Sequence, residues 1–424
     1  MQHVILGAGP AGVIAAETLR KHRPLDAITL VGDEKEPPYS RMAIPYLLMG
    51  NIPESGTWLR KGTGHFEDLQ IKVMQARATR VDPVARTLAL DSGEQLRFDT
   101  LLIATGSTPV RPPIPGIDLP GVHPCWTLDD ARKIMGLAVA GARVLQMGAG
   151  FIGCIIMEAL SARGVHLSVV EMGDRMVPRM MGATAGGMIK EWCEAKGVEV
   201  FTGTRVEAIE AGTPLSIRLS NGRQVTADLV ISATGVKPNI GFLENSGITC
   251  LQGVLTDEHM QTNVSGIYAA GDCAEAFDKI SGRTIVSAIQ PNASDQARVA
   301  GLNMAGQHAQ LKGVTQINVL DTLGLVSTSF GDWQGVPGGD QVELTDRRAG
   351  RHLSLQFKDD VMVGCNSIGW TDHVGVLRGL VEGQVKLGPW KEQLKQDPTR
   401  LMEAYIASAQ AQNDWRGADD ARRR

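Results

Sequence analysis

The same glycine pattern occurs twice in this chain, each time between a short apolar segment and a helix-like segment. The first copy occupies residues 7–12 and follows the β-branched run at residues 3–6. In such a unit the first glycine permits a tight turn, the second lets the backbone approach a pyrophosphate, and the third lets the helix lie close to the sheet. The helix N-terminus then faces the phosphates. The segment therefore predicts a dinucleotide-binding turn.

The second copy, at residues 144–153, repeats the strand, the turn and the helix. The match continues at a fixed offset, because Glu17 and Leu19 correspond to Glu158 and Leu160. Self-similarity of this kind implies two copies of one architecture and hence two dinucleotide sites.

An acidic residue follows the next strand of each copy. Asp33 and Glu34 close the second strand of the first copy at the spacing expected for a ribose-binding carboxylate. Glu171 closes the equivalent strand of the second copy, where a carboxylate accepts hydrogen bonds from an adenosine 2'-hydroxyl and repels a 2'-phosphate. Residue 172 is Met, so no arginine directly follows Glu171 to receive a 2'-phosphate, although Arg175 lies nearby. We therefore expect NADH to be favoured over NADPH.

The remaining segments complete an α/β fold. Buried strands at residues 100–106 and 228–235 both open into a glycine, and a proline-rich stretch at residues 109–124 reads as a crossover. Asp272 follows a strand and a glycine, where its carboxylate could accept hydrogen bonds from a hydroxylated chain such as ribityl. A helix is expected from Gln290 to about Gly306, with its positive end near an electron-rich ring.

The last third changes character. Alternating segments from residue 317, including a hairpin of residues 353–357 with 361–364, predict a small antiparallel sheet. Helices are expected at residues 371–383 and 398–412. The expected fold is α/β, with two Rossmann-like dinucleotide-binding domains and a small C-terminal α+β domain. The predicted domains are a dinucleotide-binding domain in two parts (1–114 and 238–312), a second, inserted dinucleotide-binding domain (115–237) and a C-terminal docking domain with a helical tail (313–424).

Charge and cysteine usage exclude other classes. Lys and Arg total 42 against 46 for Asp and Glu, so we expect no nucleic-acid or membrane partner. The first strand begins at once and no apolar run is long enough to span a bilayer, which predicts a cytoplasmic protein with reduced cysteines. None of its six cysteines has metal-ligand spacing, so no metal is expected and each cysteine is interpreted as a packing residue.

Together these motifs resemble the pyridine nucleotide-disulphide oxidoreductase family over roughly residues 1–310. The resemblance lies in the two glycine turns, in the Ala-Thr-Gly segments at residues 104–106 and 233–235, and in residues 268–272. It implies that the first half binds FAD and the inserted half binds NAD. The implied FAD contacts are Gly7, Gly9, Pro10, Ala11, Gly12, Asp33, Glu34, Arg41, Ala78, Thr105, Gly106, Gly271, Asp272, Pro291 and Asn292. The implied NAD contacts are Gly148, Gly150, Phe151, Ile152, Gly153, Glu171 and Gly235.

Departures from the family pattern decide the expected chemistry. Disulphide reductases of the family carry a Cys-x-x-x-x-Cys pair, and related oxidases and peroxidases carry a cysteine just before a Leu-Pro-Tyr; this chain has neither. Without a thiolate to receive the flavin's electrons, thiol chemistry is disfavoured and no catalytic side chain is expected. The remaining branch resembles NADH-dependent ferredoxin and rubredoxin reductases, although Tyr46 and Ile155 stand where those enzymes have a lysine and a glutamate.

Residues 150–158 and the long C-terminal segment look most like the FAD subunits of phenylglyoxylate dehydrogenase and of bacterial tungsten aldehyde oxidoreductases. The expected function is therefore hydride transfer between NAD(H) and flavin N5, with single electrons exchanged with an iron-sulfur protein, as the NAD-reducing subunit of a hetero-oligomeric aldehyde or 2-oxoacid oxidoreductase. The alternatives are a stand-alone NADH:ferredoxin or rubredoxin reductase, a non-catalytic flavin-binding module, and a thiol-linked peroxide or disulphide reductase.

The C-terminal third is expected to dock a protein partner, since aromatic anchors are typical of interfaces. It holds four of the seven tryptophans: Trp333, Trp370, Trp390 and Trp415. Each of the first three, taken singly, is better explained by packing against the small sheet, whereas Trp415 lies in a polar tail and has less reason to be buried within its own chain. Deleting residues 413–424 is expected to weaken transfer to the partner while leaving FAD content intact.

Overall fold

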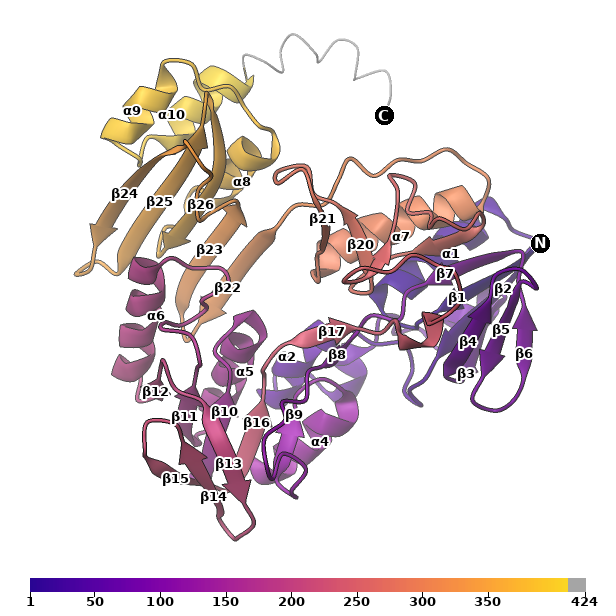
Figure 1. Ribbon diagram of the computed structural model, residues 1–424, viewed down its shortest axis with the longest axis horizontal. Coiled ribbons are helices and arrows are strands. Elements are labelled where there is room, and N and C mark those ends of the chain that lie inside the picture. The colour runs from indigo at the N-terminus through magenta and orange to yellow at the C-terminus, as the bar shows by residue number, and fades with distance from the viewer. Residues whose placement is uncertain (411–424) are drawn as a thin grey trace. The chain divides into compact units, whose positions relative to one another are not determined.

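A computed structural model of the chain describes residues 1–410 and resolves two units (Figure 1). The first unit comprises residues 1–110, 126–131 and 236–314, and the second comprises residues 111–125, 132–235 and 315–424. In both units a parallel five-stranded sheet carries a glycine turn.

The parallel sheet of the first unit has the strand order β3-β2-β1-β7-β19. Its strands are β1 (Gln2–Leu6), β2 (Ala27–Gly32), β3 (Ile71–Gln75), β7 (Thr100–Ile103) and β19 (Ile267–Ala269). The inner strands β1, β7 and β19 are almost entirely buried, as strands covered on both faces must be, whereas the edge strand β3 is largely exposed. Helix α1 (Pro10–His22) packs against α7 (Gln290–Met304), where Gly301 lets the two backbones approach.

Smaller elements complete the first unit. Its short strands are β4 (Ala78–Asp82), β5 (Thr87–Leu90), β6 (Gln95–Arg97), β8 (Ser107–Pro109), β17 (Val236–Pro238), β18 (Val254–Leu255), β20 (Ala274–Phe277) and β21 (Thr284–Val286). Its short helices are η1 (Arg41–Ala43), α2 (Ile44–Leu48), η2 (Glu54–Thr57), α3 (His65–Asp68) and η3 (Gly241–Leu243), and α4 (Leu128–Leu137) begins in this unit. Strands β8 and β17 pair with each other as the outgoing and returning crossings.

The second unit repeats the first sheet, with the order β12-β11-β10-β16-β9. Its strands are β9 (Val122–Pro124), β10 (Arg143–Met147), β11 (His166–Val170), β12 (Glu199–Phe201) and β16 (Leu229–Ser232), and an antiparallel sheet of β13 (Val206–Glu210), β14 (Leu215–Leu219) and β15 (Gln224–Ala227) matches β4-β5-β6. Helices α5 (Phe151–Ala162) and α6 (Ala183–Ala195) complete this part. The internal repeat predicted from the glycine turns is therefore a repeat of strand order as well as of sequence.

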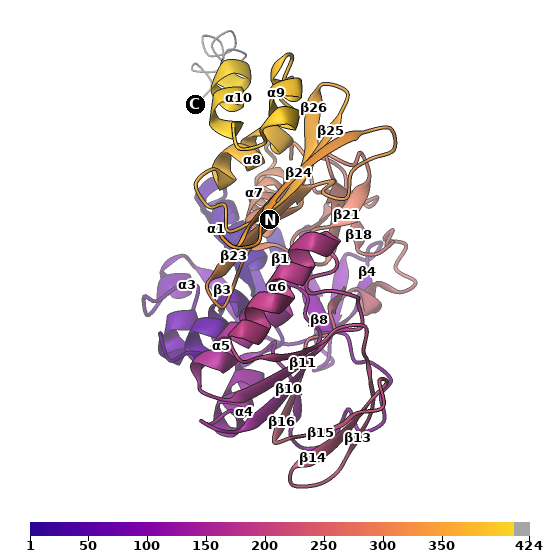
Figure 2. The same cartoon turned by 90° about the vertical axis from the view of Figure 1, so that its left-hand side faces the viewer.

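The C-terminal sheet has the order β22-β23-β26-β25-β24 and is antiparallel, as predicted. Its strands are β22 (Ile317–Thr322), β23 (Leu325–Gly331), β24 (Asp340–Asp346), β25 (Arg351–Lys358) and β26 (Val361–Ile368). Figure 2 shows α6 beside this sheet, and α6 contacts β26. The contact joins the C-terminal sheet to the second glycine-turn sheet within one unit.

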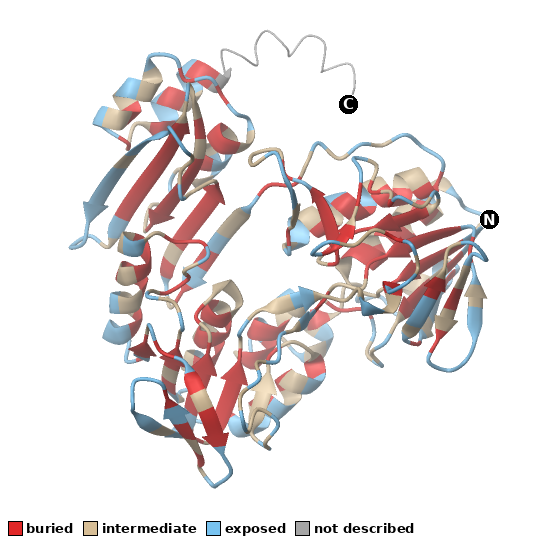
Figure 3. Cartoon of the chain, in the orientation of Figure 1, coloured by how far each residue is buried: buried red, intermediate tan, exposed pale blue. Residues whose placement is uncertain are grey.

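Two parts of the C-terminal region differ from the sequence expectation. Strand β24 was not predicted, because it is an exposed edge strand with no buried face to impose an apolar alternation (Figure 3). The helices are α8 (Val374–Glu382), α9 (Trp390–Gln396) and α10 (Leu401–Tyr405), continued by η4 (Ile406–Gln410). The expected helix at 398–412 is therefore shorter in its described part, and α9 is additional. Trp415 and the predicted tail lie outside the described residues.

Candidate dinucleotide-binding sites

The two glycine turns have the same backbone geometry. Gly7 has φ +119° and Gly148 has φ +97°. A Cβ at Gly7 would overlap the backbone carbonyl of Ala104, and a Cβ at Gly148 would overlap that of Ala233. Each alanine directly follows the neighbouring strand of its sheet. A side chain is excluded there by both conformation and space. By contrast, a Cβ at Gly9 or Gly150 would meet no protein atom within 4 Å.

The helix of each copy begins directly after the open glycine. Gly9 is the N-cap of α1 and Gly150 is the N-cap of α5, and no side chain caps either helix. Pro10 and Ala11 begin α1, and Phe151 and Ile152 begin α5. A third glycine, Gly12 or Gly153, packs against the carbonyl of the first. Each turn thus presents helical N–H groups beside an open space, which is the arrangement that binds a pyrophosphate.

The acidic end of the first copy lies in a network of side chains. Glu34 accepts a hydrogen bond from Arg41 (2.7 Å) and another from the hydroxyl of Tyr39 (2.6 Å). The guanidinium of Arg41 also donates to Tyr39 (2.8 Å) and to the carbonyl of Trp126 (2.9 Å), and it lies over both aromatic rings. Burial raises the pKa of the Tyr39 phenol, which keeps it protonated as a donor. Arg41 is thus engaged by protein groups rather than extended into solvent.

The same network leads to Asp272. The indole Nε1 of Trp126 donates to the Ser107 carbonyl (3.0 Å), and the Ser107 hydroxyl donates to Asp272 (2.8 Å). Burial raises the pKa of the Asp272 carboxyl, whereas the Ser107 hydrogen bond and the charge of Arg41 act to lower it. Sequence reasoning missed Ser107 and Trp126, because neither belongs to a motif. Only the adjacency of Trp126 to the proline-rich crossover hinted at its position.

The turn at Gly271 brings three segments together. A Cβ at Gly271 would lie 3.3 Å from the Cβ of Ala11 and 3.7 Å from that of Ala293, and its N–H donates to the buried Gln296 of α7 (2.8 Å). The start of α7 therefore stands beside the first glycine turn. Pro291 and Asn292 occupy the first turn of α7, where Asn292 donates to Ser287 (2.7 Å).

The other predicted FAD contacts lie around this group. Thr105 and Gly106 follow β7 and hydrogen-bond with Asn239 of the returning crossing. Asp33 is half-exposed and pairs with Arg77 (3.0 Å), and Ala78 begins β4 directly after that arginine. All of these residues belong to the first unit.

In the second copy the acidic residue binds the glycine turn itself. One oxygen of Glu171 accepts from the Ala149 N–H and the other from the Gly173 N–H, both at 2.7 Å. Arg175, the nearby arginine, is already engaged: its Nε donates to the Met181 carbonyl (2.9 Å) and its Nη1 to Asp174 (2.8 Å). The carboxylate therefore has no cationic partner in its own hydrogen-bond set.

A buried glutamine side chain hydrogen-bonds to the second glycine turn. Gln146 of β10 donates to the carbonyls of Gly148 and Gly153, both at 2.9 Å. Sequence reasoning counted Gln146 only as part of the strand, although a polar residue in an otherwise apolar buried strand was a signal. Gly235, with φ +108°, lies between β16 and β17.

Cysteines and metals do not define a site within residues 1–410. Cys250 is partly exposed and the other five cysteines are buried. Burial raises the pKa of the Cys193 thiol to about 12, and it raises those of Cys154, Cys273 and Cys365 as well. The described residues contain no His, Cys, Asp and Glu group able to hold a metal ion, and no helix among them is long and apolar enough to cross a membrane.

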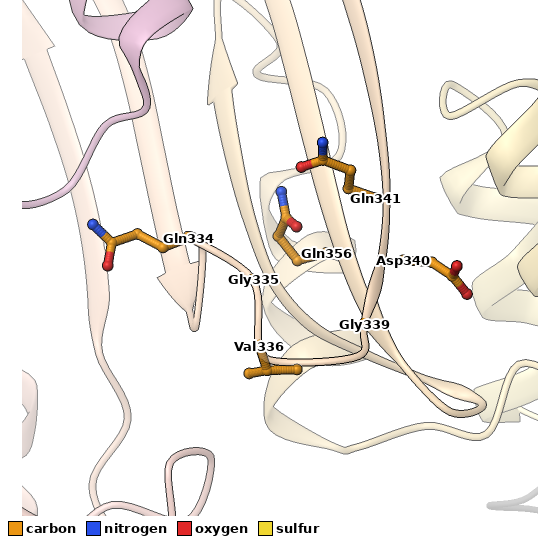
Figure 4. Close-up of a pocket in the computed structure, with 7 residues that line it drawn as sticks. All are labelled: Gln334, Gly335, Val336, Gly339, Asp340, Gln341 and Gln356. Atoms are coloured by element: carbon orange, nitrogen blue, oxygen red, sulfur yellow. The ribbon is translucent and has the colours of Figure 1, made fainter.

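One pocket of about 210 Å³ lies on the C-terminal sheet (Figure 4). It is lined by Gln334, Gly335, Val336, Gly339, Asp340, Gln341 and Gln356. None of the predicted cofactor contacts lines it.

Comparison with known proteins identifies the class. Residues 1–301 match the family model described as pyridine nucleotide-disulphide oxidoreductase, and the chain belongs to this family. FAD and NAD(H) are its cofactors, as the family resemblance implied. The α/β fold class is also confirmed.

Particular relatives are similar over most of their length. The epsilon subunit of NADH-dependent phenylglyoxylate dehydrogenase from Aromatoleum evansii is 31% identical, covering 94% of this chain and 95% of that protein. NADH-rubredoxin oxidoreductase from Clostridium acetobutylicum is 29% identical, covering 78% and 81%. Among solved structures, an NAD-dependent persulfide reductase from A. fulgidus has a TM-score of 0.84 at 27% identity, covering 92% of this chain and 78% of that one. The chain is therefore an NAD(H)-dependent oxidoreductase related to rubredoxin reductases and to a dehydrogenase subunit.

The residues fit these cofactors. The space beside Gly9 and Gly150 is open to a pyrophosphate, and a carboxylate follows the neighbouring strand in both copies. The first copy adds the partly buried acceptor Asp272, which suits the hydroxyl groups of a ribityl chain.

Proposed function

We propose that the chain binds FAD at the first turn and NAD(H) at the second, and exchanges electrons with a separate iron-sulfur protein. When bound, the flavin supplies the redox chemistry, accepting or giving a hydride at N5 and passing electrons on singly. The observation that carries this proposal is the presence of both glycine turns, each with its own acidic strand end, in one chain.

The protein's own residues bind and orient the two cofactors. Glu34 and Asp272 act as acceptors for hydroxyl groups of FAD, and the N-terminus of α7 places a positive dipole in the same unit. Glu171 acts as the acceptor for the adenosine ribose of NAD(H). This division gives each cofactor one glycine turn with one acidic strand end, and it gives FAD the additional acceptor Asp272.

A mechanism without a redox-active disulphide fits the cysteines. A reactive cysteine requires an accessible thiolate, and burial disfavours the thiolate at Cys154, Cys193, Cys273 and Cys365. Cys250 is the partly exposed exception, and burial raises its pKa as well. These environments support electron transfer from flavin to a protein partner over thiol-linked reduction.

The partner is proposed to be a subunit of a larger oxidoreductase. This chain and the phenylglyoxylate dehydrogenase epsilon subunit match over nearly their whole lengths, which supports the role of NAD-reducing subunit in an aldehyde or 2-oxoacid oxidoreductase. The similarity to NADH-rubredoxin oxidoreductase supports the second candidate, a stand-alone reductase of a small iron-sulfur protein. We place either activity in the cytoplasm, with the C-terminal third as the docking region.

Anaerobic mixing with NADH tests the enzymatic activity. NADH is expected to bleach the flavin absorbance, and an oxidised spectrum unchanged by excess NADH would support a non-catalytic binding module instead. Alkylation of the protein under reducing conditions is expected to leave NADH-to-dye activity intact. Disulphide or peroxide turnover that alkylation abolishes would overturn the thiol-free mechanism.

Purification of the native protein with metal analysis tests the partner. Iron together with tungsten or molybdenum in a stable complex is expected for the subunit role. Iron in a small separate protein would favour the stand-alone reductase. Deletion of residues 413–424 is expected to slow transfer to that partner without changing NADH-to-dye activity, and equal loss of both would contradict a docking role.

A further inference from the structure

Asn366 connects the C-terminal sheet to the loop that carries Glu171. It is a buried residue of β26, an interior strand paired on both sides, with β23 and β25. Its Nδ2 donates to the Met180 carbonyl and its Oδ1 accepts from the Gly182 N–H, both at 2.9 Å. One side-chain amide thus binds a carbonyl and an amide two residues apart, as a neighbouring strand would.

The loop of residues 171–182 also contacts the second glycine turn directly. The Val177 N–H donates to the Ala149 carbonyl (2.8 Å), while the Ala149 N–H donates to Glu171 (2.7 Å). Both backbone groups of Ala149, between the first two glycines of the turn, are therefore bound by this loop. A displacement of the loop would therefore move the Ala149 backbone and the Glu171 carboxylate, which are the groups next to the proposed pyrophosphate and ribose positions.

Removal of the Asn366 side chain is expected to displace the loop, because the loop contains a residue in an unfavourable backbone conformation. Val177 is β-branched and has φ +50°, a conformation that costs free energy unless its surroundings hold it. Met180 and Met181 are buried beside it and donate to its carbonyl (both 3.0 Å). Asn366 binds the Met180 carbonyl and the Gly182 N–H, so it fixes the C-terminal end of the segment that contains Val177.

Two further contacts join α6 to the turns of the C-terminal sheet. Trp192 of α6 donates to the Leu323 carbonyl (3.1 Å), and Glu191 pairs with Arg347 through both carboxylate oxygens (2.7 and 2.8 Å). The C-terminal sheet thus provides a rigid support on which the loop rests.

We propose that Asn366 is a positioning residue for NAD(H) recognition, acting through the loop of residues 171–182 on Glu171 and Ala149. The C-terminal sheet is in this respect part of the nucleotide site, although Asn366 touches no nucleotide. The inference rests on the proposed binding of NAD(H) at the second turn.

The test compares Asn366→Ala with Ser367→Ala. Ser367 is the next residue of β26, and its hydroxyl shares a buried hydrogen bond with Thr328 of β23 (2.7 Å), within the sheet and away from the loop. Both variants lose a buried side-chain hydrogen bond. We expect Asn366→Ala to raise the KM for NADH about tenfold, which is the effect of leaving buried backbone groups unsatisfied, with kcat and FAD content unchanged. Ser367→Ala is expected to lower the thermal stability about as much as Asn366→Ala does, but to leave the KM for NADH unchanged.

A double-mutant cycle with Glu171→Ala separates positioning from general destabilisation. If Asn366 acts through Glu171, the KM increase caused by Asn366→Ala becomes smaller in the Glu171→Ala background. Equal KM values for Asn366→Ala and Ser367→Ala, or full additivity in the cycle, would overturn the proposal. If Glu171→Ala itself leaves the KM for NADH unchanged, the assignment of NAD(H) to the second turn fails instead.

Discussion

The two glycine turns share one backbone and differ in how they hold their acidic residue. Leu6 pairs with Val31 next to the first turn, and Met147 pairs with Val170 next to the second. The residues that follow, Gly32 and Glu171, therefore occupy equivalent places. A Cβ at Gly32 would lie 2.8 Å from that of Ala8, so the first copy carries its acidic residues one and two positions later.

This displacement changes the electrostatics of the two sites. Glu34 is neutralised by Arg41 and hydrogen-bonded by Tyr39, whereas Glu171 is held by two backbone N–H groups. Backbone donors stabilise a carboxylate without cancelling its charge. The second site thus retains the negative charge that discriminates against a 2'-phosphate, and the first has lost it to an internal ion pair. A repeated fold can hold two nucleotides with different selectivities.

The largest expected effect comes from replacing the first glycine of each turn by alanine, because the two variants are expected to lose different cofactors. Gly148→Ala places a side chain on a backbone carbonyl at positive φ, which we expect to destabilise the protein by about 3 kcal/mol and to slow flavin reduction by NADH about a hundredfold. Gly7→Ala is expected to cause loss of FAD instead. Thermal unfolding, flavin content and stopped-flow reduction measure these effects.

The open glycine provides the control for this prediction. Gly150→Ala meets no protein atom within 4 Å, so it is expected to fold as the wild type does and to weaken only NADH binding. A Gly148→Ala protein with wild-type stability and NADH reduction would show that the second turn is not a nucleotide site.

Glu171→Ala tests the unneutralised charge of the second site. We expect the KM for NADH to rise about tenfold, since a ribose acceptor is lost, while the preference for NADH over NADPH narrows. The matched variant Glu34→Ala is expected to weaken FAD retention and leave that preference unchanged. Steady-state kinetics with both nucleotides check this, and a wild-type protein that uses both equally well would contradict the comparison.

Asp272 is expected to give the first site a pH dependence. In the second copy, the position three residues after the equivalent outer strand β9 is Thr127, which does not titrate. Burial raises the folded-state pKa of Asp272. A carboxyl with a raised pKa binds more protons when folded, so its contribution to stability is greatest below its unfolded pKa and is lost as pH rises through the folded pKa. At neutral pH, Asp272→Asn is therefore expected to stabilise the FAD-free protein while weakening FAD binding about tenfold.

Thermal unfolding of the FAD-free protein, measured as a function of pH, checks this sign. The wild type is expected to lose stability relative to Asp272→Asn as pH rises. A wild-type protein more stable than the variant at neutral pH would contradict it.

The smallest effect concerns the side chains that neutralise the first site. Trp126→Phe removes the hydrogen bond to Ser107 and weakens the ring contact with Arg41, and we expect about a fivefold loss of FAD affinity. Trp58→Phe is the control, because its Nε1 has no hydrogen-bond partner in the described chain. Flavin fluorescence titration measures both, and equal affinities would exclude Trp126 from the network.

Local sequence patterns identified the elements whose conformation depends mainly on their own residues. The strand, turn and helix around residues 7–12 could be predicted, because glycine spacing and apolar runs are dictated by backbone geometry. Strand β24 could not be predicted, because an exposed edge strand has no buried face to restrict its residues. Trp126, Ser107 and Asn366 were equally unpredictable, since each acts on residues far away in the sequence.

The sequence by itself determined that the chain contains two copies of a dinucleotide-binding architecture, with an acidic residue at each strand end. This follows because turns and short strands depend on local conformational preference. Only the tertiary structure decided that Arg41 neutralises Glu34, that backbone amides hold Glu171, and that Asn366 supports its loop. Charge compensation and buried hydrogen bonding depend on distances between side chains, and folding sets those distances independently of separation along the chain.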